Sequence, residues 1–193
     1  MEDLINRYHS TQFRNDRDDI PKVKIPYKDH LMGVKTVLLS AVTQTGECTD
    51  AQIIEDMCNA ALGHDLLEDT AATPEEITAA TNPHVLELIK DLTNPVDDAH
   101  TEQYMGQLRK ASEEARLVKY ADLIENTTSV AYNCYTLGEK WLSEFYEPIL
   151  TATTLVLAGT DFEKYPKTAE YMRKVLKLST ELLETKRALM GTL

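Results

Sequence analysis

The apolar residues of this chain recur every three or four positions in one segment after another. Residues 50–67 show the pattern most clearly, and their apolar positions form one stripe along a helix: Ile53, Ile54, Met57, Cys58, Ala61 and Leu62. No segment shows the sustained two-residue alternation of a half-buried strand. The pattern therefore predicts an all-α fold, with eight or nine helices around one core and all 193 residues, 1–193, in a single domain.

Start and stop signals divide the chain into these helices. Thr73-Pro74-Glu75-Glu76 combines a capping threonine, a first-turn proline and a glutamate at the third helical position. Asn82-Pro83 opens another helix, and Gly46 is expected to end one. Together these signals predict helices over residues 2–13, 28–45, 50–67, 102–110, 136–158 and 163–189, with short ones from 73 and 82 and a longer one from 112.

The formal net charge of −12 argues against a nucleic-acid partner and against docking on anionic membranes. No apolar run approaches the length of a membrane span, and the N-terminus lacks a signal-peptide pattern. The three cysteines form no CxxC pair, which favours a reducing cytoplasm. We therefore expect a cytoplasmic protein with a small-molecule partner, and its oligomeric state stays open.

Three of the predicted helices each place a histidine or an aspartate at the edge of the apolar face. Each of these residues is on the same side of its helix as an apolar residue about one turn away. The four residues are His30, His64, Asp65 and Asp122. A buried, ionised carboxylate is costly unless it is paired or bound to a metal. Two imidazoles and two carboxylates suit a divalent cation such as Mn²⁺, Fe²⁺ or Zn²⁺.

Each of these residues alone also has a structural interpretation. His30 alone would be a satisfied histidine at a helix start, and Asp122 alone a solvated helix aspartate. Glu68 and Asp69, one turn beyond the His-Asp pair, would alone be an acidic helix end. Their joint occurrence on inner helix edges favours the metal hypothesis.

Three further histidines are expected to have no role at this site. They lie in polar stretches without a partner at helical spacing: His9, His84 and His100.

The ordered set H…HD…D resembles the signature of the HD phosphohydrolase superfamily, which is all-α. Four motifs resemble more closely the hydrolase domain of RelA/SpoT-type enzymes and the small stand-alone alarmone hydrolases. Residues 26–30 resemble Pro-Tyr-x-x-His, and residues 64–70 resemble His-Asp-x-x-Glu-Asp-Thr. Residues 73–77 resemble the Glu-Glu-Ile helix that follows, and residues 118–126 resemble the helix with Lys-x-Ala-Asp-x-x-x-Asn. The resemblance spans residues 20–130, whereas the closing helices, residues 136–190, match only as a helical pattern.

The resemblance implies a role for each matching residue. His30, His64, Asp65 and Asp122 would hold one divalent metal, most simply Mn²⁺, and Glu68 and Asp69 would be the catalytic pair that activates water. Asn126 would contact the nucleotide, and Lys22 and Lys24 fall near the basic segment that would bind substrate phosphates. The implied activity is 3′-pyrophosphohydrolysis of the guanosine alarmone ppGpp. An HD-type nucleotidase or NADPH phosphatase is the alternative enzyme, and a catalytically silent nucleotide-binding HD protein is the alternative of another class.

The sequence departs from the family pattern at two places. The family often has an arginine directly after the aspartate of the fourth motif and another just past the asparagine. Here those positions hold Leu123 and Thr127-Thr128. Fewer fixed cations are therefore expected at these points of the substrate site.

Overall fold

The structure is a computed structural model that describes residues 1–14, 25–94 and 102–190. Over these ranges it contains helices and one isolated β-bridge but no strand, so the all-α prediction is confirmed. The α-helices are α1 Glu2–Tyr8, α2 Tyr27–Thr45, α3 Ala51–Gly63, α4 Leu66–Asp69, α5 Pro74–Ala80, α6 Pro83–Leu92, α7 Glu102–Lys110, α8 Glu113–Leu137, α9 Glu139–Trp141, α10 Glu147–Ala158 and α11 Pro166–Met190. A π-helical segment, η1 (Leu142–Tyr146), joins α9 to α10. Within the described part, α4 and α9 are single turns, which leaves nine longer helices.

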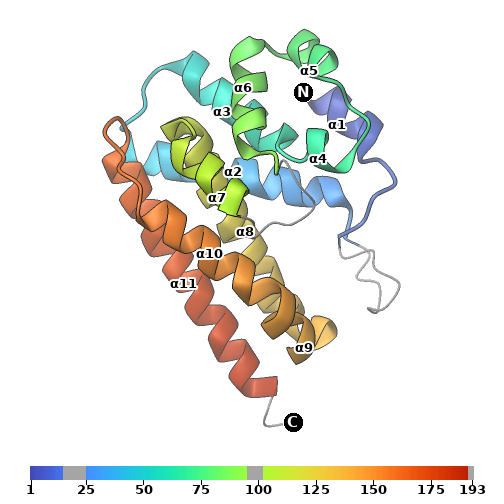
Figure 1. The fold of residues 1–193 in the computed structure, drawn as a ribbon, viewed down its shortest axis with the longest axis vertical. Helices are drawn as coiled ribbons and strands as arrows, with labels where there is room; N and C mark the ends of the chain where they lie inside the picture. The colour runs from blue at the N-terminus through green and yellow to red at the C-terminus, as the bar shows by residue number, and fades with distance from the viewer. Residues whose placement is uncertain (15–24, 95–101, 191–193) are drawn as a thin grey trace.

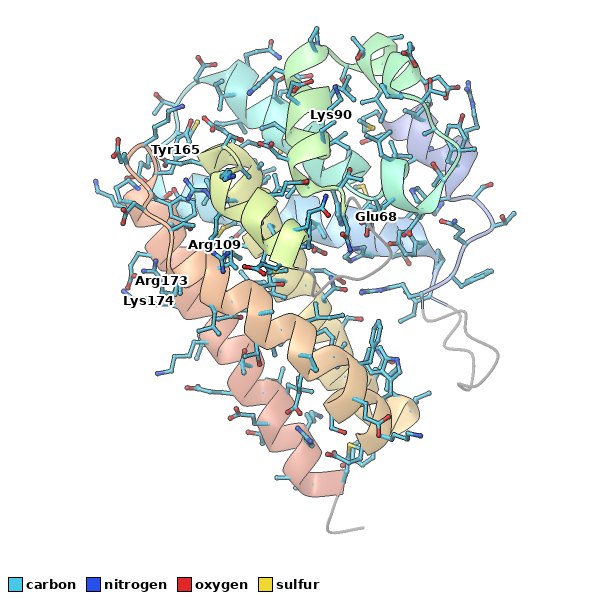
Figure 2. All side chains as sticks on the ribbon, in the orientation of Figure 1. Glu68, Lys90, Arg109, Tyr165, Arg173 and Lys174 are labelled. Atoms are coloured by element: carbon cyan, nitrogen blue, oxygen red, sulfur yellow. The ribbon has the colours of Figure 1, made fainter. Side chains whose placement is uncertain are left out.

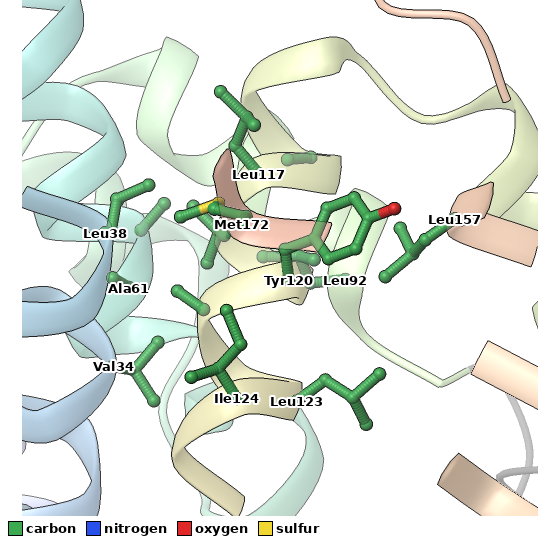
Figure 3. Packing of buried hydrophobic residues seen from close by; sticks show 14 of the residues in the cluster. Val34, Leu38, Ala61, Leu92, Leu117, Tyr120, Leu123, Ile124, Leu157 and Met172 are labelled. Carbon is green, nitrogen blue, oxygen red and sulfur yellow. The ribbon is translucent and has the colours of Figure 1, made fainter. Parts of the chain in front are cut away.

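Helix α8 lies at the centre of the fold. Helices α2, α3, α6, α10 and α11 all pack against it, and Figure 1 shows α10 running back up from α9 and α11 running down to the C-terminus. The core between these helices contains fully buried aliphatic side chains, among them Val34 of α2, Ala61 of α3 and Leu117 of α8 (Figure 3). This packing holds α2, the end of α3 and the middle of α8 next to one another.

The predicted capping signals are present. The side chain of Asp50 accepts hydrogen bonds from the first-turn amides of α3, and Thr73 and Glu76 form a capping box at α5. Ser112 caps α8 in the same way. Gly46 ends α2 with φ of 59°, a left-handed conformation that costs glycine little.

Two predicted helix boundaries were wrong. α1 ends at Tyr8 rather than at residue 13, because Phe13 instead forms an antiparallel bridge with Pro26. The predicted helix over 136–158 is interrupted: α8 continues to Leu137, and Gly138 turns the chain with φ of 80° before α9, η1 and α10 follow. A position with such a φ favours glycine, and Gly138 supplied a stop signal that the periodicity alone did not reveal.

The helix expected over residues 50–67 breaks at the His-Asp pair. α3 ends at Gly63, and the Nδ1 atom of His64 lies 2.9 Å from the carbonyl oxygen of Ala61. Asp65 has φ near −95° and ψ near −2°, and the single turn α4 follows it. Gly63 packs closely, because a Cβ atom at this position would lie 2.8 Å from Cε of Met1 and 2.9 Å from Cδ1 of Ile89. The break places both side chains at the junction of two helices.

None of the described helices combines the length and the apolar character that a membrane crossing needs.

Candidate functional site

The four histidine and aspartate side chains expected to share a site do converge. His30 is contributed by α2, His64 and Asp65 by the junction of α3 and α4, and Asp122 by α8. The Nε2 atom of His64 lies 3.1 Å from Oδ2 of Asp65 and 3.5 Å from Oδ1 of Asp122. The Nε2 atom of His30 lies 3.7 Å and 3.4 Å from the same two oxygens. Ligand-type atoms of His30, His64 and Asp65 all fall within 4.8 Å of one another.

Both imidazole rings are oriented by an acceptor on their far side. Nδ1 of His64 faces the Ala61 carbonyl oxygen, and Nδ1 of His30 contacts Oε2 of Glu125 at a short hydrogen-bonding distance. An Nδ1–H that donates to such an acceptor leaves a lone pair on Nε2. The Nε2 atom of His64 is buried and has no hydrogen-bond partner among the described residues. Two imidazole lone pairs and two carboxylate oxygens in one small volume fit a divalent cation.

Burial and opposite charges set the electrostatics of the cluster. Burial disfavours the charged form of His64, but the neighbouring carboxylates of Asp65 and Asp122 outweigh it and raise the pKa of His64 well above its usual value. Burial likewise opposes ionisation of Asp122, whose pKa is nevertheless held well below its usual range by Lys119 and the two histidines. Lys119 lies 2.8 Å from Oδ2 of Asp122. The cluster therefore contains ionised carboxylates that demand positive charge.

Glu68 and Asp69 lie beside the cluster, on α4. Burial raises the pKa of Glu68, and a backbone hydrogen bond from Asn94 to its carboxylate partly offsets this. Burial and the nearby Asp65 raise the pKa of Asp69, against the hydrogen bond from Tyr27. The Tyr27 hydroxyl lies 2.6 Å from Oδ2 of Asp65 and 2.9 Å from Oδ2 of Asp69, so its one proton serves two carboxylates. A carboxylate whose pKa is raised is better suited to accept a proton.

Asn126 is anchored at both ends of its side chain. Its Nδ2 donates to Oδ1 of Asp122 at 2.6 Å, and its Oδ1 accepts a short hydrogen bond from the guanidinium of Arg14. The same guanidinium donates to both carboxylate oxygens of Glu125, at 2.9 and 2.8 Å. No acceptor among the described residues takes the second amide N–H of Asn126, a residue that lines the pocket described next.

Most of these residues line one pocket of about 330 Å³, whereas His64 and Glu125 lie behind its wall. Its polar side contains His30, Asp65 and Asp122 together with Arg14, Lys119, Glu68 and Asp69, and its other side is an aromatic wall formed by Trp141, Phe145 and Tyr146. Figure 2 shows Glu68 separated across the molecule from Arg173 and Lys174, which lie on α11 at the opposite edge of the view. The positive charge at the pocket therefore comes from Arg14 and Lys119 among the described residues that line it.

Sequence interpretation missed three residues around the site. Glu125 was overlooked, and Arg14 was counted only among the charges of a loop, although the two form a partly buried ion pair behind His30. His9 was placed in polar surroundings, which was wrong, because its side chain is 1% exposed and stacks on Tyr27 with ring centroids 5.0 Å apart. Its position one residue beyond a helix with buried Leu4 and Ile5 was the available signal.

The remaining predicted residues divide into two groups. Lys22, Lys24 and His100 lie outside the described residues. His84 lies away from the site, with Nδ1 2.8 Å from Oδ2 of Asp56. It thus has a partner from another helix, which helical spacing in the sequence did not show.

At the two departures from the family pattern, Leu123 and Thr127 are buried and Thr128 is partly buried. Leu123 is 2% exposed and belongs to the core, and the hydroxyl of Thr127 donates to the Leu123 carbonyl oxygen and contacts the Tyr146 hydroxyl. Charged side chains would not fit here without rearrangement of α8 and η1.

No protein-family model matches the chain. A search of characterised proteins finds guanosine-3′,5′-bis(diphosphate) 3′-pyrophosphohydrolase MESH1 of Danio rerio, 32% identical over 122 residues, which are 62% of this chain and 63% of that protein. The Drosophila melanogaster protein of the same name is 28% identical over 133 residues, covering 67% and 69% of the two chains. The chain thus matches less than two thirds of the Danio rerio protein.

A solved structure described as a metazoan ortholog of SpoT that hydrolyses ppGpp superimposes with a TM-score of 0.58, covering 97% of this chain and 95% of that one. At 22% sequence identity this likeness shows the shared all-α fold. The sequence relatives, the fold and the four motifs agree. The chain is therefore similar in sequence to proteins named as guanosine-3′,5′-bis(diphosphate) 3′-pyrophosphohydrolases and shares the fold of the solved structure.

Proposed function

We propose that this protein is a divalent-metal-dependent phosphohydrolase that removes pyrophosphate from the 3′ position of a guanosine alarmone, ppGpp. The observation that carries the proposal is the convergence of His30, His64, Asp65 and Asp122 on one small volume, with the Nε2 atoms of both imidazoles turned toward the two carboxylates. The relatives named for this activity support the choice of substrate.

These four residues would hold the cation, for which Mn²⁺ is our first choice because the donor set mixes two nitrogens with two carboxylate oxygens. When bound, such a cation polarises a phosphoryl oxygen and lowers the pKa of a neighbouring water. Lys119 compensates the second oxygen of Asp122, so that one carboxylate oxygen stays directed at the imidazoles.

Glu68 and Asp69 would act as the proton-accepting pair. Both carboxylates line the same pocket as the proposed ligands, and burial raises the pKa of each. A carboxylate with a raised pKa accepts a proton from an attacking water more readily near neutral pH. Tyr27 holds Asp69 at a fixed distance from Asp65 through its shared hydroxyl, which orients the acceptor toward the phosphoryl group.

The two-sided pocket suits a nucleotide that carries phosphates. Arg14 and Lys119 supply positive charge on the polar side, and the free amide N–H of Asn126 can reach a sugar or base. On the aromatic wall the buried Nε1 of Trp141 has no acceptor among the described residues, so it can donate to a ligand. Lys22 and Lys24 would add phosphate contacts from the segment that precedes Tyr27.

We further infer that residues 1–193 act as one domain on this small molecule in the cytoplasm, without nucleic acid. The net charge of −12 disfavours polyanionic partners, and Arg14 and Lys119 supply cations at the pocket.

Incubation with ppGpp and Mn²⁺, followed by chromatography of the products, tests the proposal. Water attacks the 3′-linked phosphorus, the bond from that phosphorus to the 3′-oxygen breaks, and a proton passes to the 3′-oxygen, so GDP and pyrophosphate are expected in equal amounts. Orthophosphate release, or turnover of a nucleoside monophosphate or of NADPH in place of ppGpp, would instead assign the broader HD phosphatase activity. Repeating the assay with Zn²⁺ and Fe²⁺ decides the metal.

A further inference from the structure

Behind the proposed ligand His30 lies a carboxylate at a position that the fourth motif leaves unspecified. Glu125 is on α8, three residues after Asp122, and its Oε2 contacts Nδ1 of His30 at a short distance. The Arg14 guanidinium pairs with both carboxylate oxygens of Glu125. Because a carboxylate accepts but does not donate, His30 must donate from Nδ1, which leaves the Nε2 lone pair on the side of Asp65 and Asp122.

A glycine in α2 provides the room for this contact. Gly33 lies three residues after His30, on the same side of the helix, where glycine is unfavourable by about 1 kcal/mol relative to alanine. A Cβ atom at position 33 would lie 2.8 Å from Cγ and 3.4 Å from Cδ of Glu125. The Glu125 side chain therefore crosses α2 directly over Gly33 on its way to His30.

We propose that Glu125 is a positioning residue that fixes the tautomer and the ring orientation of His30 for metal binding, with Gly33 providing its path and Arg14 neutralising its charge. A ligand histidine whose second nitrogen donates to a carboxylate is held in one orientation and is a stronger ligand, and loss of such a partner weakens metal affinity about 10- to 100-fold. His64 has only the carbonyl oxygen of Ala61 in the equivalent place. The two proposed histidine ligands are thus supported in different ways, and only His30 depends on a side chain that can be changed. The inference rests on the proposed metal site but not on the identity of the substrate.

The first test is the Mn²⁺ affinity of Glu125→Gln, measured by calorimetric titration of the metal-free protein without substrate. Glutamine keeps the size of the side chain and removes the charge, so the dissociation constant should rise about 10-fold or more. Glu139→Gln is the matched control, because Glu139 also pairs with an arginine, Arg187, but lies outside the pocket. Its Mn²⁺ affinity should equal that of the wild type.

The second test changes a residue that touches neither metal nor substrate in the proposal. Gly33→Ala should displace Glu125 and weaken Mn²⁺ binding several-fold, although alanine favours a helix. Gly106→Ala in α7 is the matched control, because a Cβ atom there meets nothing within 4 Å. In a Glu125→Ala background, which lacks the Cγ atom, Gly33→Ala should cause no further loss, so the two changes should be non-additive.

Equal Mn²⁺ affinity of Glu125→Gln and the wild type would overturn the inference and leave the proposed function standing. Weakened affinity of Glu125→Gln in a protein that does not hydrolyse ppGpp would support the inference and overturn the proposed substrate. A wild type that binds no Mn²⁺, Zn²⁺ or Fe²⁺ would overturn both. Thermal melting of each metal-free variant identifies a change that acts through unfolding, and additive losses for Gly33→Ala and Glu125→Ala would show that Gly33 acts independently of Glu125.

Discussion

Two histidine–aspartate clusters lie at the two ends of the second half of α3, and they differ in their hydrogen bonding. At Asp56, which is 3% exposed, the carboxylate accepts hydrogen bonds from Gln52, Asn82 and His84. At Asp65 and Asp122 the neighbouring imidazoles instead present Nε2 atoms whose partner nitrogens already face acceptors. The first cluster has enough donors for its acceptors, whereas the second has an excess of acceptors.

This difference separates a structural cluster from a binding site built of the same residue types. The donors around Asp56 satisfy its charge inside the protein, and the cluster links α3 to the start of α6. The excess of acceptors around His64 suits a cation from solution. A histidine beside a buried aspartate is therefore not sufficient evidence for a metal site, and the direction of each hydrogen bond has to be known.

The largest expected effect comes from removing a residue of the acceptor-rich cluster. His64→Ala or Asp65→Ala should lose metal and reduce hydrolysis of ppGpp below detection, because each takes away one of four ligand-type groups. Elemental analysis of protein purified without chelator, together with the product assay, measures both. The control variant Asp56→Ala should keep its metal. Full activity of a metal-free His64→Ala preparation would show that the cluster around His64 is not a metal site needed for hydrolysis.

A smaller effect is expected when the proton acceptors are changed but the cluster is kept. The double variant Glu68→Gln with Asp69→Asn should retain metal and turn over ppGpp at least about 100-fold more slowly, the usual scale for a lost general base. Turnover under saturating substrate and metal content by elemental analysis give the two readouts. Loss of metal in this variant would mean that these carboxylates are ligands and that the acceptor-rich cluster is larger than the four residues.

A change in the cluster around Asp56 should affect the free energy of unfolding. Burial favours the neutral form of Asp56, but hydrogen bonds from His84, Asn82 and Gln52 outweigh it and lower its pKa below the ordinary value of 3.8. Asp56→Asn should therefore lower the free energy of unfolding by about 1–3 kcal/mol, because a donating amide faces donors. The difference from the wild type should be full above pH 3.8 and should shrink as the pH falls through the folded-state pKa.

Urea denaturation of metal-free protein over a pH series checks this prediction. Turnover per folded molecule should be unchanged at neutral pH, since Asp56 does not line the pocket. A stability difference that stays constant below pH 3.8 would show that the carboxylate is not the group responsible.

The smallest effect is expected from cations that belong to neither cluster. Lys22→Ala with Lys24→Ala should raise KM for ppGpp several-fold and change kcat less, the pattern of lost uniform binding. The wild-type KM should rise with ionic strength because lysine contacts are screened by salt. Steady-state kinetics at two salt concentrations measure both, and a fall in kcat as large as that of the Glu68 and Asp69 variant would show that these lysines act in the chemical step.

The helical fold was predictable because apolar periodicity reports directly which side of a helix is buried. His30, His64, Asp65 and Asp122 follow the apolar rows of their helices, so their convergence was expected once the helices packed together. The break after Gly63 was not expected, because the apolar spacing continues across it to Leu66.

Glu125 shows most clearly why the rest of the site could not be predicted. In the sequence, Glu125 is only a charged residue next to Asn126 in a predicted helix. Its partners Arg14 and His30 are 111 and 95 residues away. A long side chain on a helix surface can meet many partners, and only the packed structure selects one. The unusual glycine at position 33 was the trace of this contact in the sequence, but it did not show which side chain required the space.

The distance along the chain between His30 and Glu125 also determines the order in which the parts of the site are synthesised. Glu125 is made 95 residues after His30, and at about 5–20 residues per second the ribosome needs roughly 5–20 s to add them. Over that interval the nascent chain already carries His30, His64 and Asp65 without Asp122 or the carboxylate that orients His30. The newly made N-terminal half thus holds an incomplete set of ligands, and tight capture of a cation must wait until α8 has emerged and docked.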